Sequence, residues 1–357
     1  MSLMKKLQAN TTLKHTNLLS DSKVFEKEFI QTHVPMINVA LSGRINGGFS
    51  RGLTVLAGPS KHFKTSFALL MAGAFLREKP DGILMFFDSE FGAPKEYFEA
   101  FGIDPARVLH IPITTIEDLK FELAKQVENL TLKDDVFVLV DSVGNLASKK
   151  EVDDALAGSD KADMTRAKQL KSVFRMVTPH LTLKNIPMMV VNHTYSEMSL
   201  HPRQIVSGGT GIYYSADTIW IVGRNQDKNT TSGEIDGYDF IINVEKSRFV
   251  NEKSKIPISV KKNGGIQTFS GLFEMAVEFG YITSPKKGWY LTVDPLTGEP
   301  TETNRRKADI ATDGPFWRSL IKHTNFAADI QSKFELSNVM QSLPGEDEDG
   351  EVTDGGA

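Results

Sequence analysis

The chain has 357 residues, of which 40% are hydrophobic, so its length allows one large domain or two smaller ones with a sizeable core. The formal net charge is −4 and there is no cysteine, which excludes disulfides and cysteine–metal sites. No apolar run reaches the ~18 residues of a membrane-spanning helix, and the N-terminus has no apolar segment of the secretory type. We therefore expect a soluble, cytoplasmic protein that has no membrane partner.

The first 35 residues are polar and hold too few apolar side chains to fold alone. One modest helix is predicted there, over residues 21–31. Residues 1–35 are therefore predicted to form a separate N-terminal segment.

From residue 36 onward, strand-like and helix-like segments alternate. The predicted elements are strands over 53–57, 83–88, 136–142, 187–193 and 218–223, and a helix over 64–79. Apolar strands separated by helices are typical of a mostly parallel sheet with helices on both faces, so an α/β fold is predicted for residues 36–270. In such sheets ligands bind at the carboxyl ends of the strands, where the sequence places Asp88, Asp141 and His193.

Beyond residue 235 the pattern becomes an alternation that predicts antiparallel strands, with a turn at Gly264-Gly265. Residues 271–340 are predicted to form a small α+β C-terminal subdomain that includes a helix near 315–335. Residues 341–357 are predicted to be a disordered acidic tail, because 344–357 hold six acidic residues and no basic one. From its composition, the tail is expected to solubilise the protein.

The stretch "GPSKHFKTS" follows a predicted strand and opens a predicted helix, as a phosphate-binding loop does. Phe63 stands where the second glycine of the pattern is expected, so the loop alone does not distinguish a nucleotide site from a chance match. In a working loop, backbone amides would hold the phosphates, Lys64 would reach the β and γ phosphates, and Thr65 would coordinate Mg²⁺. The candidate nucleotide-binding residues are Gly58, Pro59, Ser60, Lys61, His62, Phe63, Lys64, Thr65 and Ser66.

Three further polar positions follow predicted strands. Asp141 ends an apolar strand and could hold Mg²⁺, or it could cap a helix. Glu90 could polarise an attacking water, although alone it reads as a surface glutamate. His193, with Asn192, could sense the γ-phosphate, although alone it reads as a buried histidine. Their order along one sheet favours ATP hydrolysis over each of these separate readings.

The sequence resembles the RecA family of recombinases, in particular the UvsX branch of T4-like bacteriophages. The resemblance covers roughly residues 35–290, which it identifies as a RecA-like P-loop NTPase core. The segments that carry it, besides the phosphate-binding loop, are "FDSEFG" (87–92), "DSVGNLASKKE" (141–151), "MTRAKQLKSVFR" (164–175), "NHT" (192–194), "GGTGIYYSAD" (208–217) and "VEKSR" (244–248).

The resemblance implies that Lys64 and Thr65 bind phosphate and Mg²⁺, that Asp141 supports the metal, and that Glu90 is the catalytic carboxylate. It places His193 where bacterial RecA has a glutamine that senses the γ-phosphate.

Three more residues are assigned by the resemblance alone. Tyr97 matches the tyrosine that stacks on adenine, while Lys246 and Arg248 match the basic pair that reaches the ATP of a neighbouring protomer. Without the family, this pair reads as an exposed part of a strand.

Residues 164–178 predict an amphipathic helix. Its core-facing stripe is Leu170, Val173, Phe174 and Val177. Lys168, Lys171 and Arg175 fall on a different face, which is either a solvated surface or a DNA-binding one.

The resemblance implies that loops 148–163 and 194–211 bind DNA along a filament axis through phosphate contacts, which carry no base code. The candidate DNA-binding residues are Arg166, Lys168, Lys171, Arg175, Arg203, Gly208, Gly209 and Gly211.

The predicted function is that of an ATP-dependent recombinase, which forms a helical filament on single-stranded DNA and catalyses homologous pairing and strand exchange in recombination, repair and recombination-dependent replication. It is expected to be a DNA-dependent ATPase, in which hydrolysis of ATP to ADP and phosphate is coupled to strand exchange. ATP and Mg²⁺ are the expected cofactors. Expected partners are single-stranded DNA, homologous duplex DNA, further copies of the chain, a single-strand-binding protein and a recombination mediator. The alternatives are a DNA helicase on the same core and a non-catalytic filament or loader protein.

The resemblance also implies that the N-terminal segment docks on a neighbouring protomer, with apolar anchors among Val24, Phe25, Phe29 and Ile30, and that the acidic tail competes with DNA.

Overall fold

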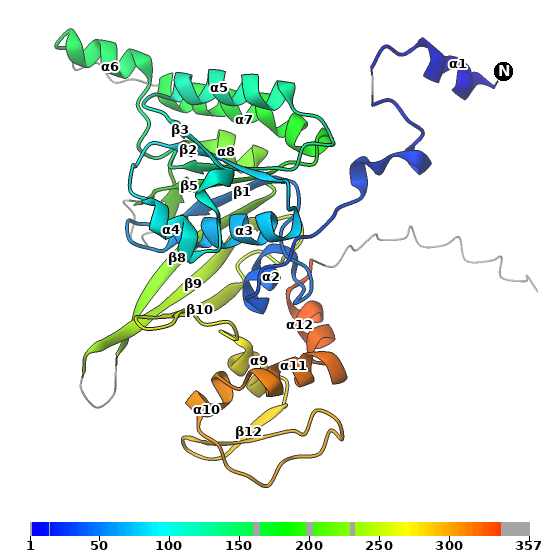
Figure 1. The fold of residues 1–357 in the computed structure, drawn as a ribbon, viewed down its shortest axis with the longest axis vertical. Coiled ribbons are helices and arrows are strands. Elements are labelled where there is room, and N and C mark those ends of the chain that lie inside the picture. Colours follow the sequence, from blue (N-terminus) through cyan, green and yellow to red (C-terminus); the bar gives the residue numbers. More distant parts are fainter. Residues whose placement is uncertain (1, 14, 160–164, 198–202, 229–232, 337–357) are drawn as a thin grey trace, which may run out of the picture.

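The computed structural model describes residues 2–13, 15–159, 165–197, 203–228 and 233–336 (Figure 1). The predicted acidic tail, and parts of both predicted DNA-binding loops, lie outside these ranges. None of the helices within these ranges is long and apolar enough to cross a membrane.

A nine-stranded sheet organises the larger part of the chain, in the order β11-β10-β9-β8-β1-β5-β4-β2-β3. Its strands are β1 (Gly52–Ala57), β2 (Ile83–Asp88), β3 (Val108–Pro112), β4 (Val136–Asp141), β5 (Pro187–Asn192), β8 (Thr218–Lys228), β9 (Ile235–Ser247), β10 (Lys255–Lys261) and β11 (Gly265–Ile266). The six strands from β8 to β3 in this order are parallel, whereas β9, β10 and β11 pair antiparallel. The predicted α/β fold is confirmed, as is the turn at Gly264-Gly265.

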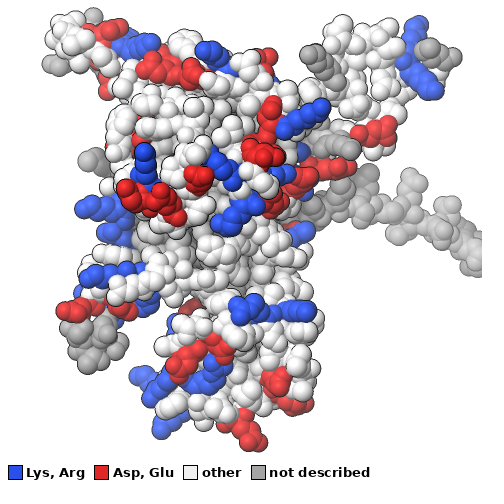
Figure 2. All heavy atoms as spheres, in the orientation of Figure 1, with Lys and Arg blue, Asp and Glu red and all other residues white. Residues whose placement is uncertain are grey.

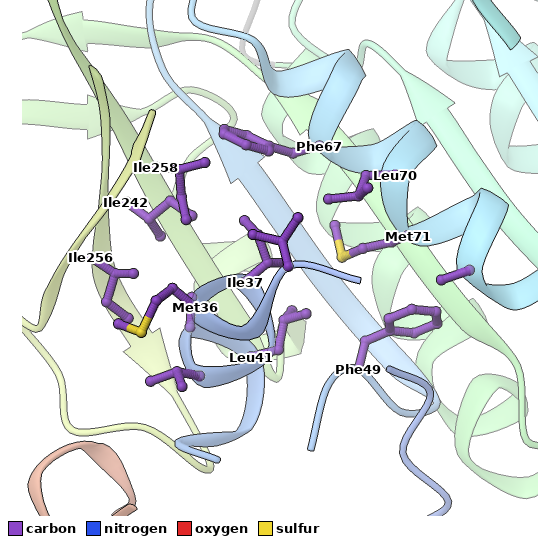
Figure 3. Close-up of a cluster of buried hydrophobic side chains, with 14 of the residues drawn as sticks. Met36, Ile37, Leu41, Phe49, Phe67, Leu70, Met71, Ile242, Ile256 and Ile258 are labelled. Atoms are coloured by element: carbon purple, nitrogen blue, oxygen red, sulfur yellow. The ribbon is translucent and has the colours of Figure 1, made fainter. Parts of the chain in front are cut away.

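Helices cover both faces of this sheet because alternate side chains along each strand are apolar and point to opposite sides. In β1, Leu53 and Val55 pack with α5 (Ile116–Asn129) and α7 (Thr165–Leu183), whereas Leu56 packs with α2 (Pro35–Ser42) and α3 (Lys64–Glu78). Figure 1 shows α5 and α7 on one face of the sheet and α2 and α3 on the other. Figure 3 shows part of the core on the face covered by α2 and α3, where side chains of these helices meet those of β9 and β10.

The shorter elements lie around this sheet. They are α4 (Lys95–Ala100), α6 (Lys149–Leu156), α8 (Thr210–Ser215), the 3₁₀ turn Pro105–Arg107, and a separate two-stranded sheet of β6 (Thr194–Ser196) and β7 (Gln204–Val206). In Figure 1, α6 projects from the upper end of the molecule.

The N-terminal segment differs from the prediction. Its helix is α1 (Leu3–Asn10), and residues 21–31 hold only the end of one 3₁₀ turn, Leu19–Asp21, and a second 3₁₀ turn, Lys23–Phe25. A helix cannot include Ile30, because Ile30 forms an antiparallel bridge with Phe49 that requires extended backbone. The predicted helix over 21–31 is therefore wrong.

The C-terminal part is built from α9 (Leu272–Glu278), the hairpin β12 (Ile282–Lys286) and β13 (Trp289–Thr292), α10 (Lys307–Ala311), α11 (Gly314–His323) and α12 (Phe326–Phe334). The single helix expected near 315–335 is two helices. The Thr324 hydroxyl donates to the Leu320 carbonyl and accepts from the amide of Phe326, which ends one helix and starts the next.

Candidate active site

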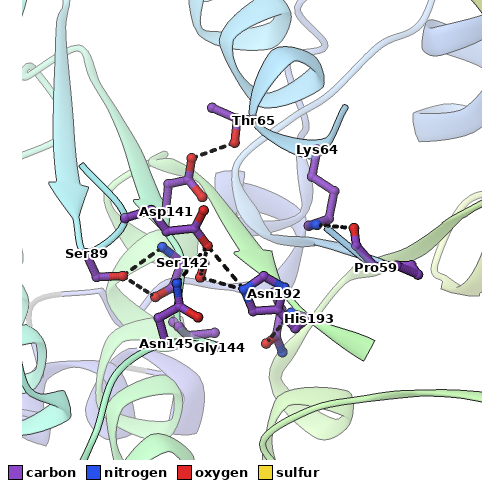
Figure 4. Close-up of polar contacts among 12 residues, drawn as sticks. Pro59, Lys64, Thr65, Ser89, Asp141, Ser142, Gly144, Asn145, Asn192 and His193 are labelled. Atoms are coloured by element: carbon purple, nitrogen blue, oxygen red, sulfur yellow. Dashed lines mark hydrogen bonds and ion pairs between the residues drawn. The ribbon is translucent and has the colours of Figure 1, made fainter. Parts of the chain in front are cut away.

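The phosphate-binding loop runs from the end of β1 to the start of α3. At Gly58, with φ at 155°, a Cβ atom would lie 2.9 Å from the carbonyl oxygen of Val222, so the strand next to the loop leaves no room for a side chain. The Nζ of Lys64 donates to the carbonyl of Pro59 at 2.8 Å, and burial lowers the pKa of this amine (Figure 4). The loop is therefore closed by its own lysine in this structure.

Phe63, the residue in place of the second glycine, has left-handed backbone with φ at 61°. This conformation is unfavourable for a residue with a Cβ atom, by about 1–2 kcal/mol. The ring of Phe63 stacks on that of Phe240 in β9, with centroids 5.0 Å apart, and meets Phe67 edge-on at 5.4 Å. Aromatic packing thus holds the backbone where the pattern normally uses glycine.

This arrangement predicts an unusual stability order at position 63. Phe63→Ala removes the ring and keeps the strained backbone, whereas Phe63→Gly removes the ring and relieves the strain. Relief of the strain favours glycine by about 1–2 kcal/mol, and the freedom that glycine gains in the unfolded chain offsets part of this. We therefore expect Phe63→Gly to be the more stable variant by on the order of 0.5–1 kcal/mol. Urea denaturation of both variants measures the difference, and an alanine variant as stable as the glycine variant would contradict the strained loop.

The candidate metal ligands Thr65 and Asp141 are in contact. The Thr65 hydroxyl donates to Oδ2 of Asp141 at 2.6 Å, while Oδ1 is buried and has no hydrogen-bond partner among the described residues (Figure 4). Burial raises the pKa of Asp141 to about 6. An unpaired carboxylate oxygen beside a threonine hydroxyl fits the oxygen ligands that Mg²⁺ takes.

The raised pKa of Asp141 predicts a pH-dependent stability difference. The native carboxyl group holds its proton up to about pH 6, whereas in the unfolded chain it loses that proton near pH 3.9. The protonated carboxyl group of Asp141 therefore makes its full contribution to the free energy of unfolding below about pH 4, and this contribution is lost as the pH rises through 6. Without Mg²⁺, the free energy of unfolding of Asp141→Asn, relative to that of the original chain, should rise by on the order of 2 kcal/mol between pH 4 and pH 7. Urea denaturation at a series of pH values measures it. A pH-independent difference would contradict the burial of the charge.

Glu90 and His193 meet at the carboxyl ends of β2 and β5. Oε1 of Glu90 accepts from the Ser142 hydroxyl at 2.6 Å, from Nε2 of His193 at 3.2 Å and from Nδ2 of Asn145 at 3.2 Å (Figure 4). The hydrogen bond from His193 is the largest of the contributions that lower the pKa of Glu90. Sequence reasoning missed Ser142 and Asn145, because no motif distinguishes them from other polar residues after a strand.

Asp88 fixes the backbone on which Glu90 stands. Its Oδ1 accepts from the amides of Glu90 at 3.0 Å and Phe91 at 2.8 Å. Its Oδ2 lies 3.1 Å from Nε2 of His110 on β3. Together with Thr65, Glu90 and Asp141, Asp88 lines a cavity of about 290 Å³. The expectation that Asp88, Asp141 and His193 meet at one edge agrees with the observed strand order.

Two other candidate positions are held by contacts within the chain. Asn192 is buried and donates to the carbonyl of Ser207 at 2.7 Å, so it anchors the segment before α8. The hydroxyl of Tyr97 is hydrogen-bonded to that of Ser66 in the first turn of α3. Tyr97 lines both the cavity at Asp141 and an adjoining one of about 330 Å³ along the phosphate-binding loop, which also includes His193.

Lys246 and Arg248 lie near the amino ends of the parallel strands, opposite the ends that carry the candidate active site. Ser247, between them, pairs with Thr218 at the start of β8, whereas the phosphate-binding loop follows the end of β1. Arg248 forms an ion pair with Asp217 at 2.7 Å, and Lys246 donates to the carbonyl of Tyr213. Neither residue can therefore reach the phosphate-binding loop of its own chain.

The candidate DNA-binding helix α7 has the two faces that its sequence predicts. Its apolar stripe is buried, and Lys168, Lys171 and Arg175 are exposed. These three residues and Lys120 of α5 line a groove of about 390 Å³, and within the described ranges no acidic side chain forms an ion pair with the three. Lys120 was missed because the pairing of α5 with α7 is a tertiary contact. Elsewhere, Figure 2 shows basic and acidic side chains interspersed, so the face in view carries no continuous basic surface.

The remaining DNA-binding candidates have close neighbours in the protein. Arg166 donates to the carbonyls of the turn after β4. A Cβ at Gly208 would lie 2.4 Å from Leu170, and one at Gly211 would lie 2.6 Å from the Cβ of Lys171, so both glycines permit close packing on α7. Gly209 precedes α8, and Arg203 is exposed.

Comparisons with known proteins agree with this architecture. Residues 269–330 match the family described as the C-terminal domain of the bacteriophage T4 recombination and repair protein. The chain is also 44% identical over 341 residues to the "Recombination and repair protein" of Enterobacteria phage T4, covering 94% of this chain and 87% of the relative. The chain belongs to the UvsX branch of the RecA recombinase family.

Proposed function

We propose that the chain acts in DNA recombination and repair as an ATP-dependent recombinase that forms a helical filament on single-stranded DNA and exchanges homologous strands. The observation that carries the proposal is the convergence of Lys64, Thr65, Glu90, Asp141 and His193 on adjoining cavities at one edge of the sheet. The relative in phage T4, named for recombination and repair, supports the same role.

In this proposal Lys64 leaves the carbonyl of Pro59 to contact the phosphates of ATP, and Thr65 and Asp141 hold Mg²⁺. The metal supplies neutralisation of charge on the phosphate oxygens. Glu90 orients and polarises the attacking water. Nε2 of His193, which donates to Glu90 in this structure, would donate instead to a phosphate oxygen of ATP. ADP and phosphate are the expected products.

The groove of Lys120, Lys168, Lys171 and Arg175 would hold DNA phosphates. Such interactions are insensitive to sequence and weaken with salt, so sequence would be read by pairing between strands. Replacing Lys168 and Arg175 by glutamate is expected to weaken binding to single-stranded DNA and to reduce the slope of log K against log salt by about 0.7 for each phosphate that is no longer neutralised. Fluorescence anisotropy over a salt series measures the slope. An unchanged slope would show that these side chains are only solvated and do not bind DNA phosphates.

Filament formation would place a second copy of the chain against exposed apolar residues of the N-terminal segment. Of the predicted anchors, Ile30 is buried in its own chain and Phe29 packs edge-on against Phe249 at 5.8 Å, whereas Phe25 is 71% exposed. Leu3, Met4 and Leu7 of α1 are also exposed, so we propose α1 and Phe25 as the docking surface. Homologous duplex DNA, a single-strand-binding protein and a recombination mediator are the further partners proposed.

A joint-molecule assay tests this function. The purified chain, ATP and Mg²⁺ should pair a single strand with a homologous duplex and should fail with a heterologous one. Unwinding of a forked duplex without homologous pairing would favour the helicase alternative. Joint molecules that form equally well with Lys64→Ala would favour a filament or loader protein that does not use ATP.

A further inference from the structure

The turn that follows β4, residues 143–146, connects the candidate active site with the candidate DNA-binding helix. On one side it reaches Glu90, since Nδ2 of Asn145 lies 3.2 Å from Oε1 of that carboxylate (Figure 4). Asn145 itself is exposed. The contact is therefore not required for the core, and it places a hydrogen-bond donor on the group that would activate water.

On the other side the turn is held by Arg166, in the first turn of α7. The Nε of Arg166 donates to the carbonyl of Leu146 at 2.9 Å, and its Nη2 donates to the carbonyls of Val143 at 3.0 Å and Gly144 at 2.9 Å. A guanidinium group is planar with its donors in a fixed fork, so three carbonyl partners fix the turn relative to α7. This arrangement directs Arg166 toward protein carbonyls, not toward a phosphate in solution.

The turn has little freedom to move without moving the residues of the site. A Cβ atom at Gly144 would lie 2.2 Å from Cδ2 of His193, so the imidazole ring rests directly on the glycine backbone. A displacement of the turn therefore changes both the ring that donates to Glu90 and the amide of Asn145. Closely packed elements of this kind move between discrete arrangements because they do not deform continuously.

We propose that Arg166 and Asn145 are positioning residues that couple occupancy of the groove between α5 and α7 to the state of Glu90. When phosphates bind Lys168 and Lys171, the first turn of α7 shifts, Arg166 carries the 143–146 turn with it, and Asn145 leaves Glu90. In the arrangement described here, Oε1 of Glu90 accepts three hydrogen bonds, which hold the carboxylate in place and reduce its basicity. The inference rests on the proposed DNA-dependent ATP hydrolysis and names the residues through which DNA would act on Glu90.

The test is the ratio of ATP hydrolysis rates with and without saturating single-stranded DNA. Asn145→Ala should raise the kcat without DNA about 3- to 10-fold, the factor expected for loss of one hydrogen bond of typical net strength. The ratio should fall by the same factor, with the affinity for single-stranded DNA unchanged in anisotropy. Arg166→Lys, which keeps the charge and loses the fork, should also lower the ratio. The double variant should show no further effect, because both residues act through one turn.

Arg107 supplies the matched control. Its guanidinium also donates to three backbone carbonyls, those of Leu76, Lys79 and Gly82, before the start of β2, whereas Glu90 follows the other end of that strand. Arg107→Lys should lower stability and leave the ratio unchanged. A ratio that stays at its original value in both Asn145→Ala and Arg166→Lys overturns the proposal, and so does an effect of Arg166→Lys that merely follows weakened DNA affinity. If the unaltered chain hydrolyses no ATP, the proposed function fails instead.

Discussion

Glu90→Gln is expected to lower the kcat for ATP hydrolysis by roughly 10²–10⁴-fold, the contribution typical of a positioned general base. The amide of glutamine keeps the size of the side chain and can accept from Ser142, but it cannot take a proton from water. Nucleotide affinity should change little, because Lys64 and the phosphate-binding loop are intact. Single-turnover hydrolysis and equilibrium nucleotide binding measure the two effects separately.

Glu96→Gln is the matched control, because Glu96 is an exposed glutamate on α4, only six residues away along the chain. It should keep the full rate. A Glu90→Gln variant that hydrolyses ATP at more than about a tenth of the original rate would remove Glu90 from the role of general base.

Arg248→Ala is expected to lower hydrolysis by about 10³-fold or more, the effect typical of an arginine supplied to another protomer's phosphates. Arg248 lies near the amino ends of the parallel strands, so it cannot act on the phosphate-binding loop of its own chain. Its side chain is 58% exposed, so loss of the ion pair with Asp217 should change the free energy of unfolding by less than about 1 kcal/mol. The loss of activity should therefore appear in a folded protein.

Mixing two inactive variants decides whether Arg248 acts in trans. Glu90→Gln protomers supply an intact Arg248, and Arg248→Ala protomers supply an intact Glu90. Random assembly in equal amounts makes about a quarter of the interfaces complete, so the mixture should recover about a quarter of the original rate. A mixture as inactive as its components would show that Arg248 does not complete a neighbour's site.

The strands and the fold class could be predicted because buried parallel strands are continuous apolar runs, and the carboxyl ends of such strands meet at one edge. Asp141, Glu90 and His193 could be found for the same reason, since each follows such a run. The N-terminal helix could not be placed, because the bridge between Ile30 and Phe49 is a tertiary contact that overrides local preference.

Other features depend on contacts that no local pattern contains. The backbone of Phe63 is held by Phe240, which is distant along the chain. Arg166 is a DNA-binding candidate from the sequence, and only the path of the turn after β4 gives it three carbonyl partners. Lys120 joins the groove only because α5 packs against α7.

The central claim is that ATP is bound between successive protomers of a filament on single-stranded DNA. Electron cryomicroscopy of the full chain with single-stranded DNA, Mg²⁺ and a slowly hydrolysed ATP analogue tests it directly. We predict an open helical filament, with each nucleotide between the Lys64 loop of one protomer and Lys246 and Arg248 of the next, and with DNA phosphates at Lys168 and Lys171. Closed rings, or nucleotide with no contribution from the neighbouring protomer, would contradict the account.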